Sequence, residues 1–438
     1  MSENAKPVAK SDVRLRVAER SQVVWKAQCL DDLLPPQHRA RTVWAVVASL
    51  DLSAFAAPIK ARDGMPGRDS TDPRLLVALW LYAAVRGVGS ARELARLCAE
   101  SRPYEWLCGG VGVNHRLLSD FRTGHAAALD ALFTDTIAVL VKQGLVKVRR
   151  VSQDGLKVRA SAGSGSFRRA STLQKLRQEA AAHVDELRAL LDDPARSAGL
   201  SARQRAARTR AAKERLARVE AAQQLIPKLQ ERQARSARRL SKRQQKEQQR
   251  EPRASTSDAE ASRMKMGDGG YRPAVNVQLA SDTESRAILG VSVTAEGVDY
   301  AQSEPMREQV RRRTGRAVGE HLYDGGYVTT DAVERADAQG VVVYAPPKPP
   351  KDPDKYGDAF TPRQGDSEAV VRWRQRMGSE QGQQVYKQRA STSETINAQM
   401  RRSGLVQVTV RGIAKVTCVA LWSALAYNLM LFADALRA

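Results

Sequence analysis

Helical spacing of apolar side chains dominates the chain from about residue 25 to residue 144. Leucine, alanine and valine recur every three or four positions in DPRLLVALWLYAAVRGV, SARELARLCAE and AALDALFTDTIAVLVKQG. Ser90 and Asn114 stand where their side chains could cap the start of a helix. The pattern predicts a compact helical domain over residues 25–144. Residues 1–24 are polar and basic without apolar periodicity, and we expect them to be disordered.

An alternation of apolar and polar residues begins at Leu145. The stretch LVKVRRVSQDGLKVRA is rich in valine and predicts a strand or a hairpin, with Asp154 and Gly155 at its turn. Downstream, YRPAVNVQLASD and SRAILGVSVTAEGVD predict a β-hairpin. EPMREQVRRRTG, VGEHLYD, TDAVERADAQG and VVVYAP predict helix, strand, helix and strand. This order predicts an α/β layer, built from residues 145–166 and 264–438, in which helices cover a mixed sheet.

Residues 167–263 interrupt this α/β layer with a long helical pattern almost without aromatic residues. Breaks near Asp193-Pro194, Gly199 and Pro227 favour two or more long helices folded into an antiparallel hairpin. About 25 Lys and Arg stand against about 12 Asp and Glu in this insertion. One interpretation is a solvated coiled coil; the other is a basic arm that binds the DNA backbone or a second subunit. The one-sided charge favours the basic arm.

A second apolar helix is predicted at Val416–Leu436. This stretch is about long enough to span a bilayer, but it carries Thr417, Asn428 and Asp434. Helices that are apolar all round are also typical of the core of large folded domains. We therefore expect a buried core helix and no membrane association.

The stretch YKQRASTSETINAQMRRSGL, residues 386–405, predicts a helix with charged side chains on one face. Residues 391–393 are candidate N-caps, and Gly404 is a natural C-terminal stop. Glu394 and Arg401 are seven positions apart and therefore share a face. Taken alone, the same pattern also describes a surface helix with scattered charges.

The charge of the whole chain narrows the choice of partner. In 438 residues the net charge is +23 and the pI is about 10.2, which points to a polyanion. Nucleic acid is the leading candidate, because the N-terminal stretch has neither the apolar core of a signal peptide nor a lipidation motif. The four cysteines are widely spaced and form no CxxC pair, so neither a zinc site nor a disulfide framework is expected. A reducing cytoplasm fits this composition.

Three stretches of the chain resemble bacterial insertion-sequence transposases of the DDE type. VSQDGLKVRASAG and HLYDGGYVTTDAV match that family around its first two aspartates, here Asp154 and Asp324. The signature around its last acidic residue is a tyrosine, an arginine, a glutamate and a lysine or arginine. Here it is matched by Tyr386, Arg389, Glu394 and Arg401. Three separated motifs are much harder to meet by chance than one.

The resemblance implies a ribonuclease-H-like fold and a metal-dependent site. It makes Asp154, Asp324 and Glu394 the catalytic residues, which hold two Mg²⁺ ions, or Mn²⁺ as a substitute. The activity it implies is cleavage and joining of double-stranded DNA at the ends of the element and at the target. The resemblance also implies a chain that dimerises on DNA and associates with the nucleoid in the cytoplasm. The alternative for Asp154 and Asp324 is a plain turn residue in each case, since Asp-Gly is a common turn pair.

Further DNA contacts are expected from both halves of the chain. The resemblance makes Arg389 and Arg401 phosphate clamps and lets Tyr386 contact the DNA backbone; the alternative is a structural ion-pair cluster. In the helical domain, Arg116 and Arg122 lie on a predicted second helix of helix-turn-helix type that could read the major groove. Both could equally be solvated surface cations.

Two other functions remain open at this point. A non-catalytic DNA-binding relative would keep the basic regions and lose activity, although the intact acidic triad argues against such decay. A structure-specific nuclease on the same fold would cleave DNA without joining it.

Overall fold

The computed structural model describes residues 21, 23, 27, 29–61, 68–237, 251–350, 352 and 357–437. The predicted disordered segment, residues 1–24, lies outside the described residues except for Ser21 and Val23. Parts of the proline-rich stretch before residue 357 also lie outside them.

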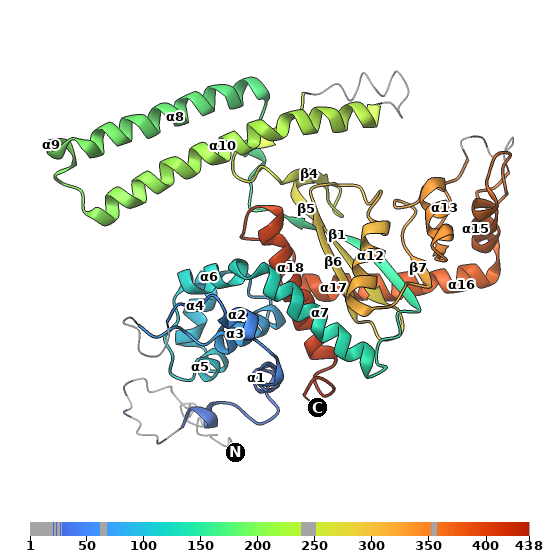
Figure 1. The fold of residues 1–438 in the computed structure, drawn as a ribbon, viewed down its shortest axis with the longest axis horizontal. Helices are drawn as coiled ribbons and strands as arrows, with labels where there is room; N and C mark the ends of the chain where they lie inside the picture. Colours follow the sequence, from blue (N-terminus) through green and yellow to red (C-terminus); the bar gives the residue numbers. More distant parts are fainter. Residues whose placement is uncertain are drawn as a thin grey trace, which may run out of the picture.

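A six-stranded mixed sheet forms the centre of the molecule (Figure 1). The hydrogen-bonded order is β4-β5-β1-β7-β8, with β6 also paired to β5. β1 runs antiparallel to β5 and parallel to β7, which is parallel to β8. The predicted α/β class and the order strand, hairpin, helix, strand, helix, strand are confirmed. The strands are β1 (Arg150–Arg159), β4 (Ser262–Lys265), β5 (Tyr271–Asp282), β6 (Ile288–Thr294), β7 (Glu320–Leu322) and β8 (Val342–Tyr344).

Helices that follow the strands pack on this sheet as the apolar spacing predicts. α12 (Ser303–Thr314) contacts β6 and ends at Gly315, whose φ of 67° is in the left-handed region that glycine favours. α13 (Thr330–Ala338) begins at its cap Thr329, which accepts a hydrogen bond from the Ala332 backbone N–H at 3.1 Å. α15 (Glu368–Gly378) packs on α13 and β8.

The stretch around Asp154, predicted as a strand or a hairpin, is a single strand, β1. Asp154 and Gly155 do not form a turn: they lie in the middle of β1, opposite Leu279 and Gln278 of β5. A Cβ on Gly155 would stand 2.5 Å from an oxygen of Asp299, so glycine is required here by crowding across the sheet. The parallel pairing of β1 with β7 ends at Ser152, so Asp154 stands just past that pairing.

The N-terminal region is helical, as predicted, with the expected caps Ser90 and Asn114. It shares one continuous hydrophobic cluster with the sheet: Phe133 of the region and Leu156 of β1 both belong to it and are fully buried. The helical region and the sheet are therefore packed as one unit. Its helices are η1 (Leu30–Leu33), α1 (Arg39–Ser49), α2 (Ser53–Ala56), α3 (Pro73–Val85), α4 (Ala91–Glu100), α5 (Arg102–Cys108), α6 (His115–Gly124) and α7 (Ala126–Lys142).

The helix α18 (Ile413–Leu431) joins the helical region to the sheet, because it packs against α3, α7 and β6. Among the described residues, α18 is the one helix that by itself is long and apolar enough to cross a membrane. The helices α6 and α7, which are joined by a bend, also meet this criterion when they are taken together. Most of α18 is buried in the molecule. The Asn428 side chain accepts from the Ile288 N–H at 2.9 Å and donates to its carbonyl at 2.8 Å. The predicted core helix is confirmed.

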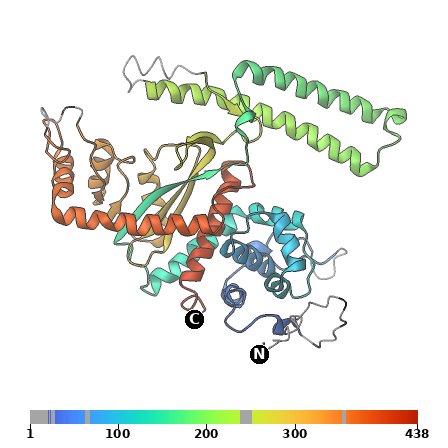
Figure 2. The ribbon, with the colours of Figure 1, turned by 180° about the vertical axis from the view of Figure 1, so that it is seen from behind.

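The insertion is an antiparallel helical hairpin that stands away from the sheet (Figures 1 and 2), as predicted. Its helices are α8 (Ala170–Asp192), α9 (Pro194–Ser197) and α10 (Ala202–Ala237). After the short η2 (Ser164–Ser166), the two-stranded pairing of β2 (Phe167–Arg168) with β3 (Ala254–Ser255) closes its base.

A predicted break in the insertion at Pro227 is wrong, because α10 continues through it. Proline removes one hydrogen bond from a helix interior. Here the neighbouring Ile226 and Ala222 are buried in a cluster with Leu173 of α8, and this packing holds the helix on either side of the proline.

The helix of residues 386–405 starts earlier than predicted. α16 (Glu380–Arg389) begins at its cap Ser379 and continues through a single π-helical turn, η3 (Ala390–Glu394), into α17 (Thr395–Arg402). Ser391 is no N-cap, because its hydroxyl donates to the Gln388 carbonyl at 3.1 Å. Gly404, with a φ of 89°, follows the end of α17 as predicted.

Candidate functional site

Asp154 is the centre of the site. Its Oδ2 accepts a hydrogen bond from Asn397 Nδ2 of α17 at 2.9 Å, and its Oδ1 accepts from the Gly155 N–H at 2.9 Å. Arg389 Nη1 lies 3.8 Å from Oδ2. Burial raises the pKa of Asp154; Arg389 opposes this, while Asp299 and Asp324 add to it. Asp154 is therefore a carboxylate whose negative charge is only partly compensated.

Asp324 follows β7 and is exposed. Its Oδ1 accepts a hydrogen bond from the Gly326 N–H at 2.6 Å, which fixes the carboxylate at the end of the strand. Asp324 is close enough to raise the pKa of both Asp154 and Tyr386 by its charge. The structure therefore places Asp154 and Asp324 in one electrostatic neighbourhood at the strand ends.

Glu394 is exposed on the π-helical turn. Its neighbour Ser393 lies 2.6 Å, oxygen to oxygen, from Ser152 of β1, and Asn397 binds Asp154, so the helix docks on β1 immediately beside Glu394. Within the described residues the Glu394 carboxylate makes no hydrogen bond or ion pair. Nor does that part of the chain hold a group of three or more His, Cys, Asp or Glu that could bind a metal ion as it stands. The structure thus brings Asp324 within electrostatic reach of Asp154 and docks the helix that carries Glu394 on β1.

Arg389 and Tyr386 lie next to Asp154. The Arg389 guanidinium stands 5.7 Å from the centre of the Tyr386 ring, and its Nε is buried without a hydrogen-bond partner among the described residues. Burial raises the pKa of Tyr386; Arg389 opposes this, and the charges of Asp324 and Asp154 raise the pKa further. Arg389 therefore places a cation beside Asp154.

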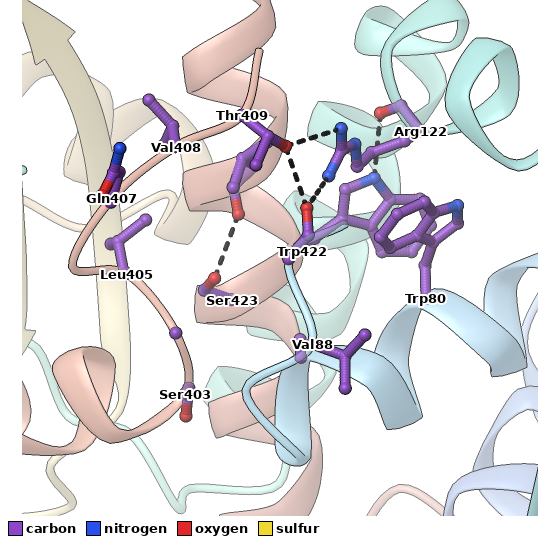
Figure 3. A pocket seen from close by; sticks show the side chains of 14 residues that line it. Trp80, Val88, Arg122, Ser403, Leu405, Gln407, Val408, Thr409, Trp422 and Ser423 are labelled. Atoms are coloured by element: carbon purple, nitrogen blue, oxygen red, sulfur yellow. Dashed lines mark hydrogen bonds between the residues drawn. The ribbon is translucent and has the colours of Figure 1, made fainter. Parts of the chain in front are cut away.

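The three other predicted DNA contacts differ in exposure. Arg401 and Arg116 are exposed, on α17 and at the start of α6. Arg122 is only 5% exposed: it donates to the Gly89 carbonyl at 2.5 Å and lies 4.6 Å from the centre of the Trp80 ring (Figure 3). Its guanidinium is not available to a phosphate, so the DNA-contact hypothesis for Arg122 does not fit the structure.

His321 is fully buried on β7, packed edge-on against Tyr323 with ring centroids 4.9 Å apart. Burial holds the pKa of His321 well below its ordinary value, so the ring is neutral. His321 is therefore a packed residue of the sheet core.

Sequence reasoning did not identify Asn397, which binds Asp154, or Asp299, whose charge raises the pKa of Asp154. The bond of Asn397 to Asp154 depends on how α17 meets β1. Asp299 lies in the loop after β6, outside every motif, where it accepts from Asn276 Nδ2 at 2.8 Å and Gln278 Nε2 at 2.6 Å. The alternation of these two amides on valine-rich β5 is the one signal that could have marked a polar site there.

Comparison with protein families agrees with this geometry. A family described as Transposase DDE domain matches residues 352–432, and a family described as Transposase domain (DUF772) matches residues 28–124. The chain belongs to the DDE-type transposases. No curated protein and no solved structure was found to match it.

The two matches fall on the parts of the transposase that pack together. The DDE match contains α15 to α18, and with them Glu394, Arg389 and Asn397. The other match covers α1 to α6 of the helical region. Asp154 and Asp324 lie outside both matched ranges, so their assignment rests on the motifs and on their place in the sheet.

Proposed function

We propose that this transposase cuts double-stranded DNA at the ends of its own mobile element and joins those ends to a target. The observation that supports this most is the docking on β1 of the continuous helix α16–η3–α17, which carries Tyr386, Arg389, Glu394 and Arg401 and is called the signature helix below. Asn397 and Arg389 from that helix both face Asp154, and Asp324 acts on the same carboxylate. The mixed sheet with two parallel pairs beside an antiparallel hairpin suits the ribonuclease-H-like core that the motifs imply.

The donor set of the site suits a divalent cation. Asp154 and Asp324 offer carboxylate oxygens, which Mg²⁺ and Mn²⁺ prefer, and the burial of Asp154 leaves charge for a cation to offset. Two bound Mg²⁺ ions would activate the attacking water or 3′-hydroxyl and stabilise the leaving oxygen. In this proposal Glu394 completes the site by a change in the π-helical turn, since such turns interrupt the regular hydrogen bonding of a helix.

The remaining residues of the site bind and orient. Asn397 holds the Asp154 carboxylate in one orientation through its amide. Arg389, whose Nη1 lies 3.8 Å from Asp154 Oδ2, would hold a phosphate at the site. Tyr386 packs under that guanidinium, and Arg401 extends the cationic rim at the end of α17.

DNA binding outside the site is assigned to exposed cations. In the arm, a groove between α8, α9 and α10 is lined by Arg196, Arg208 and Arg215, together with Glu186. Arg116 at the start of α6 offers a contact from the helical region. The net charge of +23 supports binding to the backbone of double-stranded DNA in the cytoplasm, with two copies assembling on the paired element ends.

The test uses the full chain and a plasmid that carries the DNA bordering its gene. We expect cleavage at the borders and joined products in Mg²⁺ or Mn²⁺, and none in EDTA. Binding without cleavage under all metal conditions would favour the non-catalytic relative, and cleavage of plain plasmid without joining would favour a nuclease.

A further inference from the structure

The hairpin formed by β4 and the start of β5 projects beyond the rest of the sheet. β4 pairs with Tyr271 to Ala274 of β5, whereas the pairing of β1 with β5 ends at Ala274 and that of β6 ends at Asn276. Beyond Ala274, β4 and β5 therefore have only each other as partners among the described strands. We call residues 262–273 the ribbon; it lies at the end of the sheet nearest to the arm (Figure 1).

The tip of the ribbon is held in one shape by its own hydrogen bonds. The Met266 N–H donates to the Gly270 carbonyl at 2.8 Å, and the Gly269 N–H donates to the Met266 carbonyl at 3.0 Å. Asp268 accepts from the Gly270 N–H at 3.1 Å and from Arg272 at 2.7 Å. The bond from Arg272 lowers the pKa of Asp268 and offsets its charge. The ribbon is therefore ordered before it meets a partner, which reduces the entropy lost on binding.

The two faces of the ribbon differ in chemistry. On the inner face, Met264 is 2% exposed and lies against Gly297 of the loop after β6. On the outer face, Arg263, Lys265 and Tyr271 are all exposed, and Tyr271 is 60% exposed. Within the described residues neither cation forms an ion pair or a side-chain hydrogen bond. Arginine, lysine and tyrosine side chains are among those that commonly contact phosphates and sugars of DNA.

The outer face of the ribbon continues the face of the sheet that carries Asp154. Residues opposite each other in an antiparallel pair share a face, and the faces alternate along each strand. Asp154 lies opposite Leu279 of β5, and Lys265 lies opposite Tyr271. Tyr271 and Leu279 are eight positions apart, so all four residues lie on one face. Eight residues of a strand span about 26 Å, which is the length of about seven to eight base pairs.

We infer that the ribbon is a DNA-binding element, which enters the major groove of a duplex that follows β5 away from Asp154. This inference rests on the proposed function, because that function places the cleaved bond at Asp154. The major groove of B-DNA is wide enough for a two-stranded ribbon. Arg263 and Lys265 then bind phosphates at the borders of the groove, and Tyr271 contacts the DNA between them. The contact lies about seven to eight base pairs from the cleaved bond.

A second copy of the chain is the rival partner for this face, through the exposed Tyr271. Charge favours DNA over a second copy. Each chain has a net charge of +23, so the cations of the ribbon would repel another copy. A duplex carries one negative charge for about every 1.7 Å of its axis, and it would attract them.

The test measures binding of the full chain to a fluorescent border duplex in EDTA, by anisotropy at several salt concentrations. We expect the double variant Arg263→Gln, Lys265→Gln to make the slope of log K against log salt shallower by about 2, since two phosphate contacts are lost. Tyr271→Ala should weaken binding about 10-fold. It should leave the slope unchanged, because it removes no charge.

The matched control is the double variant Lys142→Gln, Arg149→Gln, which removes the same charge. Both residues are exposed and precede the start of β1, whereas the ribbon lies beside its end. We expect this control to keep the wild-type slope. An equal change of slope in the control and in the ribbon variant would reveal a general effect of charge and would overturn the inference.

Hydroxyl-radical footprinting of the same duplex locates the contact. The ribbon variants should lose protection about seven to eight base pairs from the cleaved bond, and loss elsewhere would overturn this placement. Wild-type affinity and slope in the ribbon variants would overturn the role of the ribbon and leave the proposed function intact. Unchanged DNA affinity with weaker self-association of Tyr271→Ala in light scattering would assign the face to a second copy. A wild-type chain without affinity for border DNA would overturn both proposals.

Discussion

The helical region and the arm are both helical, and both are proposed to contact DNA, yet they are attached to the sheet in different ways. The helical region shares the main hydrophobic cluster, and Trp422 of α18 donates from its indole N–H to the Arg122 carbonyl at 3.0 Å. The arm has its own small cluster and joins through the short β2–β3 pairing. Movement of the helical region would therefore disturb the core, whereas the arm can change position without doing so.

The junction of the helical region also reaches the signature helix. Gly404, just after α17, faces Gly87, just after α3: a Cβ on Gly404 would stand 2.8 Å from the Gly87 carbonyl oxygen. Both glycines have positive φ, 89° and 71°. Because backbones this close admit no side chain, the end of the helix that carries Glu394 is held directly by the DNA-binding candidate region. The arm has no comparable hold on that helix.

The largest expected effect comes from a substitution in α18 at its contact with the helical region. Trp422 is 2% exposed, so Trp422→Ala should lower the free energy of unfolding by about 3–5 kcal/mol through lost burial and a residual cavity. Urea unfolding followed by circular dichroism measures it. A loss below about 1 kcal/mol would show that the helical region is not part of the core, and the comparison would fail.

Removing the arm should weaken DNA binding and leave the stability of the core unchanged. Phe167 and Ser255 are paired neighbours, so a short Gly-Ser turn can replace residues 169–253 and remove about half of the chain's excess positive charge. We expect the free energy of unfolding of the remaining core to stay within about 1 kcal/mol of the wild-type value. Affinity for any DNA should fall, and log K should depend less steeply on log salt. An unchanged salt slope would show that the arm does not bind the DNA backbone.

The smallest expected effect is a pH-dependent change in stability, which compares the partly buried Asp154 with the exposed Asp324. The pKa of Asp154 is raised, so its ionisation in the folded state costs stability as pH rises above the unfolded value of about 3.9. Asp154→Asn should therefore raise Tm at pH 7 and hardly at all near pH 4. The exposed Asp324→Asn is the matched control and should leave Tm unchanged. An equal gain at both pH values would contradict this account.

Local patterns predicted most elements, and long-range contacts explain the failures. The β5–β6 hairpin, α12, α13 and the arm follow from spacing and caps that lie within each segment. Of the strand and the hairpin that the sequence allowed around Asp154-Gly155, the structure shows the strand, in which Asp299 from far along the chain crowds Gly155. The exposure expected for Arg122 failed for the same reason, since Thr409 and Trp422 cover it from the C-terminal region.

The candidate site was predictable only in part. The motifs predicted that Asp154 and Asp324 belong to one site, and this stays a prediction; the structure shows that the charge of Asp324 raises the pKa of Asp154. The contacts of Asn397 and Asp299 depend on the packing of α17 and of a loop against β1. No local sequence pattern predicts this packing. The participation of Glu394 stays a prediction, because its side chain is exposed and forms no acidic cluster with Asp154 and Asp324 among the described residues.

The most direct test of the central claim is the single-turnover cleavage rate of border DNA in Mg²⁺ for Asp154→Asn, Asp324→Asn and Glu394→Gln. The exposed Asp331→Asn on α13 serves as control. We predict rates at least about 100-fold below the wild type for all three, as expected for removal of a metal ligand, with unchanged DNA binding in EDTA and a wild-type rate for the control. Near wild-type cleavage by any one variant would remove that residue from the site, and by Glu394→Gln would contradict the three-carboxylate mechanism itself.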